Sequence, residues 1–382
     1  MVRDSDVSEG QFDDPKQDFP VSDYTLFGSD MSYFSGKARA YLRWKGIPFQ
    51  EIAPTPQVMK DEIIPNIGWP VIPVLKTPEG NYVQDTADII DYFEEKSDGV
   101  SAYPQTPLQR FVSFLFQLFA DEWLTLPAMH YRWNHNEDWI YGEFGKSAAP
   151  DASLEEQYEA GKAVGARFRG FVPMLGITDE TAPGIERAYE QFLADFSAHL
   201  ELMPYVFGTR ASFADFALIG PLYAHQYRDK ASGEHMKQIA PRVADWVERV
   251  IAGYGRDGAL IGDDDLPKSF LPILKVQMAE QVPTLEKTND MFAQWAIERS
   301  SGDAVPRGFD MIEFQTGGVS GHCMARSFPL FRLQAALDDF NAMDTSDRAR
   351  AEAFLSAVGG ERLIDFKLAA PLARKNYRVC LA

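Results

Sequence analysis

The chain has 382 residues, of which 45% are hydrophobic and 13% aromatic, so it is long and apolar enough for two domains with buried cores. Its 37 basic and 56 acidic residues give a formal net charge of −19. This charge argues against duplex nucleic acid and anionic membrane as partners, because both attract a basic face. The two cysteines, Cys323 and Cys380, are too few for a disulfide scaffold or a Cys-based zinc site.

The first 21 residues are rich in acids and poor in apolar side chains, and this composition predicts a disordered acidic leader. They show no positively charged segment followed by an apolar core, the pattern of a secretory signal. No apolar run in the chain approaches the roughly 20 residues that span a bilayer. The sequence therefore predicts a soluble, cytoplasmic protein.

Residues 22–98 carry an alternating pattern of strands and helices. A strand at 24–28 is followed by a loop, a helix at 36–45 that ends at a glycine, and a second strand at 48–52. A segment with two prolines, 69–75, then precedes a turn at 77–80 and a helix that begins at residues 85–86. The last helix has an apolar stripe at Ile89, Ile90 and Phe93 with helical spacing. The pattern predicts one small α/β domain.

Residues 97–107 are rich in turn-forming residues and are interpreted as a linker. Residues 107–300 show helical spacing and no strand pattern, with helices expected over 154–172, 184–202, 212–228, 240–253 and 269–299. Pro127 is expected to break the first long helix. Ser212 and Asp215 form an N-cap box at the start of an apolar helix. Residues 301–382 are predicted to be a helical extension, with helices at 328–343 and 345–358, packed on the second domain.

This order, with an isolated proline before a strand and a Ser-x-x-Asp box opening an apolar helix, resembles the glutathione S-transferase family. The resemblance implies an α/β thioredoxin-like N-terminal domain followed by an all-α helical domain. It also implies that the chain binds glutathione and a hydrophobic small molecule, and that it forms a homodimer. The family's box is structural and contacts no substrate.

Ser32 lies where serine-type classes of this family keep the serine that activates glutathione. A helix N-terminus offers unpaired N–H groups and partial positive charge, and a donated hydroxyl hydrogen bond lowers a thiol pKa further. Tyr33 and Ser35 are rival hydroxyls in the same loop. The absence of a cysteine at position 32 argues against thiol–disulfide exchange.

The resemblance assigns two further contacts with glutathione. Ile72 and Pro73 occupy the place of the family's cis-proline, where backbone groups pair with the cysteinyl part of the tripeptide; Pro70 is the competing proline. Asp85 and Thr86 take the place of an acid and a serine that hold the γ-glutamyl end, although Asp is shorter than the usual residue. The same pair is also an ordinary helix N-cap.

The second substrate is expected between the domains, against an apolar and aromatic surface. The candidate residues are Tyr33, Phe34, Trp123, Met129, His130 and Trp133. An aromatic stripe of this kind is also typical of a helical core. His130 and His135 are possible acids or bases, and the sequence shows no phosphate loop, dinucleotide fingerprint or carboxylate–histidine metal spacing. The glycine-rich segment ending in His322 and Cys323 is interpreted as packing or a lid.

Together these features predict a glutathione-dependent transferase. It would activate the thiol for attack on an apolar electrophile by conjugation, ether cleavage, dehalogenation or isomerisation. The alternative is a non-catalytic binding or scaffold protein on the same fold, because a fold does not fix a function.

Overall fold

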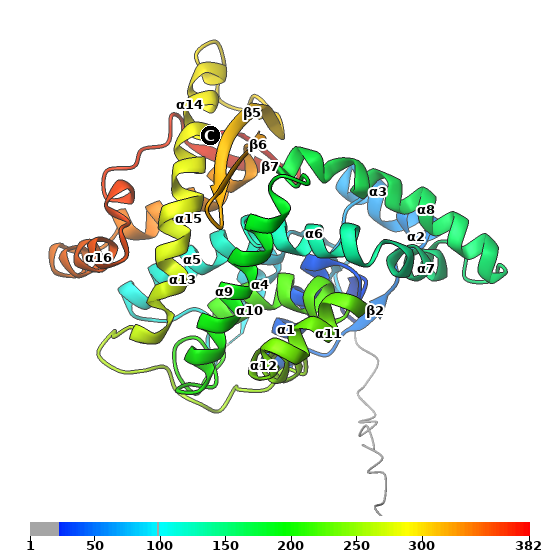
Figure 1. Ribbon diagram of the computed structural model, residues 1–382, viewed down its shortest axis with the longest axis horizontal. Coiled ribbons are helices and arrows are strands. Elements are labelled where there is room, and N and C mark those ends of the chain that lie inside the picture. Colours follow the sequence, from blue (N-terminus) through cyan, green and yellow to red (C-terminus); the bar gives the residue numbers. More distant parts are fainter. Residues whose placement is uncertain (1–22, 98) are drawn as a thin grey trace, which may run out of the picture.

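The computed structural model describes residues 23–97 and 99–382 (Figure 1). They form a small α/β domain, a larger helical domain and a C-terminal extension. The acidic leader predicted for residues 1–21 lies outside the described residues. Within the described residues, no helix combines the length and the apolar character needed to cross a bilayer.

The first domain is built on a four-stranded mixed sheet of order β2-β1-β3-β4. Strand β1 pairs in parallel with β2 and antiparallel with β3, and β3 pairs antiparallel with β4. The strands are β1 (Thr25–Phe27), β2 (Gln50–Ile52), β3 (Val74–Lys76) and β4 (Tyr82–Gln84), and the helices are α1 (Tyr33–Lys45), α2 (Pro56–Val58), α3 (Ile64–Ile67) and α4 (Thr86–Lys96). The thioredoxin-like order predicted from the sequence is confirmed, and the Ile72–Pro73 peptide bond is cis, as the resemblance implies.

The second domain is helical, as predicted. Its helices are α5 (Pro107–Glu122), α6 (Thr125–His135), α7 (Glu137–Ala148), α8 (Leu154–Phe171), α9 (Ala182–Leu200), α10 (Phe213–Pro221), α11 (Lys230–Ile239), α12 (Pro241–Ile251), α13 (Leu271–Val276) and α14 (Val282–Ala296). The expected break occurs at Trp123–Leu124, just before Pro127. Pro127 itself lies in the first turn of α6, where a missing N–H is tolerated because those groups have no intrahelical partner.

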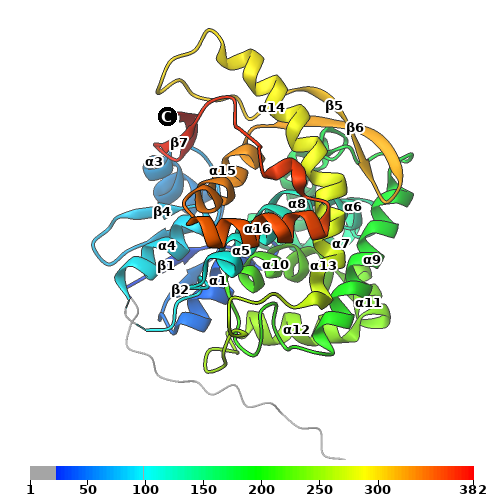
Figure 2. The same ribbon diagram turned by 90° about the vertical axis from the view of Figure 1, so that its left-hand side faces the viewer.

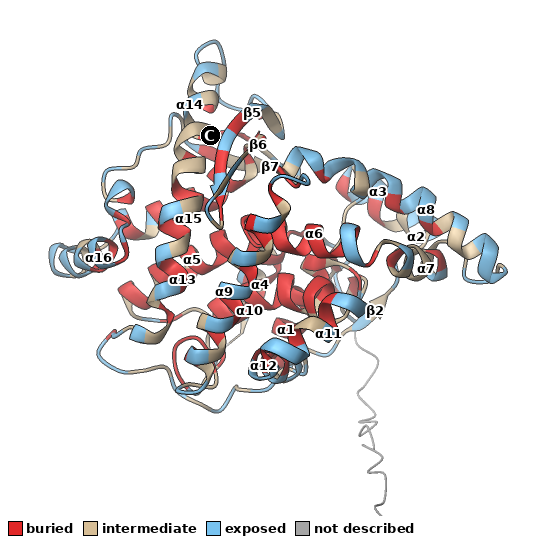
Figure 3. Cartoon of the chain, viewed as in Figure 1, coloured by how far each residue is buried: buried red, intermediate tan, exposed pale blue. Residues whose placement is uncertain are grey.

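The predicted N-cap box opens α10, whose residues are all buried. The Asp215 carboxylate accepts hydrogen bonds from the backbone N–H and hydroxyl of Ser212, and from the indole N–H of Trp246 at 3.2 Å. Burial raises the pKa of Asp215 to about 6, although these hydrogen bonds act to lower it. The box is therefore a structural feature of the domain core (Figure 3).

Helices α7 and α8 form a pair that projects from one side of the molecule (Figure 1). Their backbones approach closely at two glycines of the contact. A Cβ at Gly161 would lie 1.8 Å from the carbonyl oxygen of Tyr141, and one at Gly145 would lie 1.9 Å from that of Gln157. These positions admit no larger side chain without separating the helices.

The extension contains both predicted helices, α15 (Phe328–Asn341) and α16 (Thr345–Val358), but the prediction that it is helical throughout is wrong. It also has two β-hairpins, β5 (Gly308–Thr316) with β6 (Val319–Arg326), and β7 (Leu372–Lys375) with β8 (Arg378–Leu381). In β5 buried and exposed residues alternate, with Ile312, Phe314 and Thr316 buried. Gly317 and Gly318 form the turn with φ of 52° and 78°, so the segment interpreted as a glycine-rich loop is a hairpin.

The extension packs on both domains, whereas the sequence predicted contact with the second domain. Helix α15 lies on α5, with the rings of Phe340 and Phe111 stacked at 5.2 Å. From there the chain returns to the first domain, where the hydroxyl of Tyr377 donates to the carbonyl oxygen of Tyr82 at 3.0 Å. Figure 2 shows this path, with β7 ending on the side of the molecule that holds α3 and β4.

Candidate active site

Ser32 is the N-cap residue of α1. Its backbone is extended, and its hydroxyl oxygen accepts a hydrogen bond from the N–H of Ser35 at 3.2 Å. The side chain is half-buried. The hydroxyl therefore lies at the positive end of a helix and remains partly accessible, the setting that stabilises a thiolate.

Tyr33, the rival hydroxyl, is directed away from this loop. Its O–H donates to the backbone carbonyl of Ala120 on α5, and the side chain is 7% exposed. Burial and the nearby carboxylate of Asp121 raise the pKa of Tyr33 well above its ordinary value. Ser35, the third hydroxyl, is fully buried.

The loop before Ser32 is held by the second domain. Arg132 of α6 donates to the carbonyl oxygen of Met31 at 2.7 Å and forms a two-pronged ion pair with Asp229, at 2.7 and 2.8 Å. Both charged side chains are buried. This network links the start of α1 to α6. The sequence does not reveal it, because Arg132 is 101 residues from Met31 and 97 residues from Asp229.

The segment with two prolines lies half-exposed beside the sheet. Ile72 is half-buried and Pro73 buried. The guanidinium of Arg307, from the start of the extension, lies 4.2 Å from the centre of the Trp69 indole ring. The extension thus reaches the segment expected to align glutathione.

Asp85 is the N-cap of α4, as predicted, and accepts from the N–H of Ala87 at 2.9 Å. It also forms an ion pair with Arg332 of α15. Burial alone would raise the pKa of Asp85, but the charges of Arg332 and Arg374 hold it below its ordinary value. Asp85 is 9% exposed and Thr86 3% exposed, so the predicted γ-glutamyl contacts lie beneath the extension.

The β7–β8 hairpin completes this cover. Arg374 donates to the side-chain oxygen of Gln84 at 2.6 Å and to its carbonyl at 3.2 Å, and it pairs with Asp88. Tyr377, at the hairpin tip, packs on the small apolar cluster around Phe27, Ile63, Ile67 and Val74, to which Trp69 and Ile72 also belong. No sequence motif marked these contacts.

Two further ion pairs, each with a buried carboxylate, lie where α5 meets α1 and the extension. Lys37 pairs with Asp121 at 2.7 Å, and Arg326 pairs with Glu122 at 3.0 Å. Burial raises the pKa of Glu122 to about 7, although the positive charge of Arg326 acts to lower it. The region between the domains is therefore charged as well as aromatic.

The six residues expected around the second substrate are not gathered in one cavity. Trp123 lines two adjacent small cavities, one against α9 and the other against β5 and β6, and neither is lined by the other five. Trp133 is buried against the rings of Tyr141 and Phe144. Tyr33 contacts the ring of its neighbour Phe34, Met129 is half-buried in the core, and His130 faces Glu186.

Cys323 lies on β6 beside one of these cavities. Burial raises the pKa of its thiol to about 11, so it is protonated at neutral pH and a poor nucleophile. This agrees with the interpretation of its segment as packing.

Two family models match the sequence. The model for the glutathione S-transferase N-terminal domain matches residues 26–101, and the model for the C-terminal domain of that family matches residues 177–253. The chain belongs to the glutathione S-transferase family. At family level this supports a glutathione-dependent transferase.

Solved structures with a similar fold come from several organisms. The beta-etherase LigF from Sphingobium sp. strain SYK-6 is 18% identical, with 61% of this chain and 96% of that chain covered and a TM-score of 0.44. A glutathione S-transferase from Rhodospirillum rubrum F11 is 15% identical, covering 65% and 97% with a TM-score of 0.41. Rice GST1 in complex with glutathione is 18% identical, covering 67% and 99% with a TM-score of 0.38. No curated protein matches the sequence.

Proposed function

We propose that this protein is a glutathione-dependent transferase in which Ser32 activates the glutathione thiol. The observation that carries the proposal is the half-buried Ser32 hydroxyl at the N-terminus of α1, within the domain that matches the family. The hydroxyl donates a hydrogen bond to the thiolate sulfur, and the α1 N-terminus supplies partial positive charge. Tyr33 is excluded from this role because its hydroxyl is already donated to Ala120.

The tripeptide lies along the first domain in this proposal. Ile72 and Pro73 align its cysteinyl backbone, and Thr86 at the start of α4 binds the γ-glutamyl end. Asp85 pairs with Arg332 of α15, so Arg332 places positive charge beside the γ-glutamyl carboxylate. Because Asp85 and Thr86 are covered, the β7–β8 hairpin moves to admit glutathione.

The activated thiolate attacks an apolar electrophile near Trp123. A bond forms between the sulfur and an electrophilic carbon; in a substitution the leaving group departs with the electron pair of the broken bond, and in an addition that pair moves onto a neighbouring atom of the substrate. The thiol proton is released when glutathione binds as the thiolate. Conjugation, ether cleavage, dehalogenation and isomerisation all begin with this attack. As in the family, we propose a cytoplasmic homodimer; the exposed apolar side chains of α8, Val164, Phe168 and Phe171, offer surface for such contacts.

A second candidate function, a non-catalytic binding or scaffold protein, is favoured by one specific observation. The extension already contacts the places where glutathione would bind: Arg307 at Trp69, Tyr377 at Tyr82 and Arg332 at Asp85. In this alternative the extension permanently occupies the site that glutathione takes in other family members.

Thermal unfolding with millimolar glutathione separates the two functions. The transferase proposal predicts a rise in unfolding temperature for the wild type. It predicts a larger rise for Tyr377→Ala, whose hairpin opens more easily because it has lost its bond to β4. Tyr254→Ala, at a side chain that is 65% exposed, is the control and should respond as the wild type does. No rise in any of the three proteins would contradict the transferase proposal and support the non-catalytic one.

A further inference from the structure

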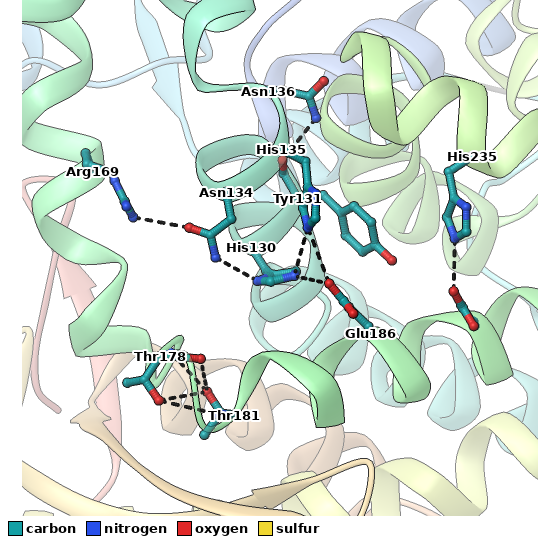
Figure 4. A network of polar contacts seen from close by, with 11 residues as sticks. His130, Tyr131, Asn134, His135, Asn136, Arg169, Thr178, Thr181, Glu186 and His235 are labelled. Carbon is teal, nitrogen blue, oxygen red and sulfur yellow. Dashed lines mark hydrogen bonds and ion pairs between the residues drawn. The ribbon is translucent and has the colours of Figure 1, made fainter.

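Two histidines and a glutamate of the second domain converge on one point (Figure 4). The Nε2 atom of His130 lies 2.9 Å from Oε1 of Glu186, and Nε2 of His135 lies 3.3 Å from the same oxygen. The two Nε2 atoms are 3.4 Å apart. His130 and His135 come from α6 and Glu186 from α9.

These separations match the spacing of ligands around a tetrahedral metal ion. Zinc binds imidazole nitrogen and carboxylate oxygen at about 2.0–2.1 Å, which places neighbouring ligand atoms about 3.3 Å apart. Hydrogen bonds explain only two of these three close contacts. If both imidazole rings donate their Nε2–H to Glu186, the two Nε2 atoms both carry protons and cannot bond to each other at 3.4 Å. One cation accounts for all three.

We propose that His130, His135 and Glu186 bind a divalent transition-metal ion, with Zn²⁺ as the best-fitting occupant. Imidazole and carboxylate ligands suit zinc, and three protein ligands leave a fourth position for water. The His130 side chain is 3% exposed, whereas those of His135 and Glu186 are 42% and 39% exposed. The ion therefore contacts a buried ligand, His130, on one side and is exposed to solvent on the side of His135 and Glu186.

The surroundings hold the ligands in place. Nδ1 of His130 lies 2.9 Å from the side-chain amide of Asn134. A metal on Nε2 requires the proton on Nδ1, and the amide oxygen of Asn134 accepts it after a rotation that exchanges the amide nitrogen and oxygen. This rotation replaces the 3.5 Å contact that the oxygen now makes with the guanidinium of Arg169. The ring of Tyr131 lies against that of His135, with centroids 5.2 Å apart.

These three residues match no metal-binding sequence motif, and the reason is physical. His130 and His135 are five residues apart, which is not the one-turn spacing that places two ligands on one helix face. His135 is the last residue of α6 and Asn136 departs from helical geometry, so the ring can turn back toward His130. Glu186 comes from a different helix, and only the fold brings it near.

Metal titration of the full chain, without a histidine tag and after chelator treatment and dialysis, tests this site. Calorimetry with Zn²⁺ should give one equivalent bound, and Co²⁺ should give the visible absorption of four-coordinate cobalt. Glu186→Gln and His135→Ala should each weaken binding at least about 100-fold, and Asn134→Ala about 10- to 100-fold. All three side chains are at least partly exposed, and an unchanged far-ultraviolet spectrum confirms folding.

His235→Ala is the matched control, because His235 pairs with Glu190 at 3.1 Å in a comparable histidine–carboxylate contact. It should leave metal affinity unchanged. Substoichiometric binding by the wild type would overturn the proposal and assign the cluster to hydrogen bonding alone. Equal affinity in wild type and Glu186→Gln would also overturn it, since the ion would then bind elsewhere.

Discussion

The ion pair between Arg332 and Asp85 joins the extension to the first domain, and its loss should be costly. The two side chains are 6% and 11% exposed. Arg332→Met keeps the length and apolar stem of the side chain and removes its charge. The carboxylate of Asp85 then remains buried, with Arg374 as the main remaining compensating charge.

The size of the effect follows from this burial. Removing one partner of a buried ion pair costs about 3–5 kcal/mol, because the other charge is left without compensation. Unfolding entropy is about 2.1 cal/mol/K per residue, which for roughly 360 ordered residues makes 4 kcal/mol equivalent to about 5 °C. The double variant Asp85→Asn with Arg332→Met should recover about half of this loss, since no charge is then left unpaired.

Differential scanning calorimetry measures this shift. Arg362→Met is the matched control on the same extension, since Arg362 pairs with Glu286 but is 60% exposed. An exposed pair contributes about 0–1 kcal/mol, so the control should shift the unfolding temperature by about 1 °C. A shift for Arg332→Met no larger than that of the control would refute the inference that this contact fastens the extension.

Three further predictions concern buried charge and close packing. Because burial raises the pKa of Glu122 from 4.5 to about 7, the folded state binds more protons than the unfolded state in that window. Stability should therefore fall by up to about 3 kcal/mol as pH rises through it; Glu122→Gln should flatten the profile measured by urea unfolding, and an unchanged profile would contradict the assignment. Gly161→Ala should destabilise the protein by about 2 kcal/mol or more by pushing α7 from α8. Gly170→Ala, with open space around its Cβ, should stabilise α8 by about 0.5–1 kcal/mol, and equal effects of the two would count against the close approach. Arg132→Met should cost about 3–5 kcal/mol in chemical unfolding, since it leaves Asp229 buried without its partner; a loss below 1 kcal/mol would be inconsistent with the network.

The first domain was predictable because its signals are local. Ser32 and Asp85 each precede a helix within a few residues, and Gly46 ends α1 with φ of 75°. Such caps depend on neighbouring residues and can be recognised from sequence alone. The family resemblance added what local chemistry does not contain, the cis bond at Pro73.

The cover over the candidate site was not predictable, because it depends on contacts between distant parts of the chain. Arg332 is 247 residues from Asp85, and Arg374 is 290 residues from Gln84. A charged side chain in an amphipathic helix is usually solvated, so nothing local marks Arg332 as buried. The β5–β6 hairpin is a different case, since its alternating residues and the Gly317–Gly318 turn were present in the sequence as a signal.

Ultraviolet titration of the thiol of bound glutathione tests the role of Ser32 most directly. The thiol pKa should be lowered in the wild type and equally in Tyr33→Phe, because the Tyr33 hydroxyl donates to Ala120 of α5 and not to glutathione. In Ser32→Ala the thiol pKa should rise most of the way towards that of free glutathione, because only the partial positive charge of the α1 N-terminus remains. An equal lowering in Ser32→Ala, or no change on binding to the wild type, would contradict the assignment of Ser32 as the activating residue.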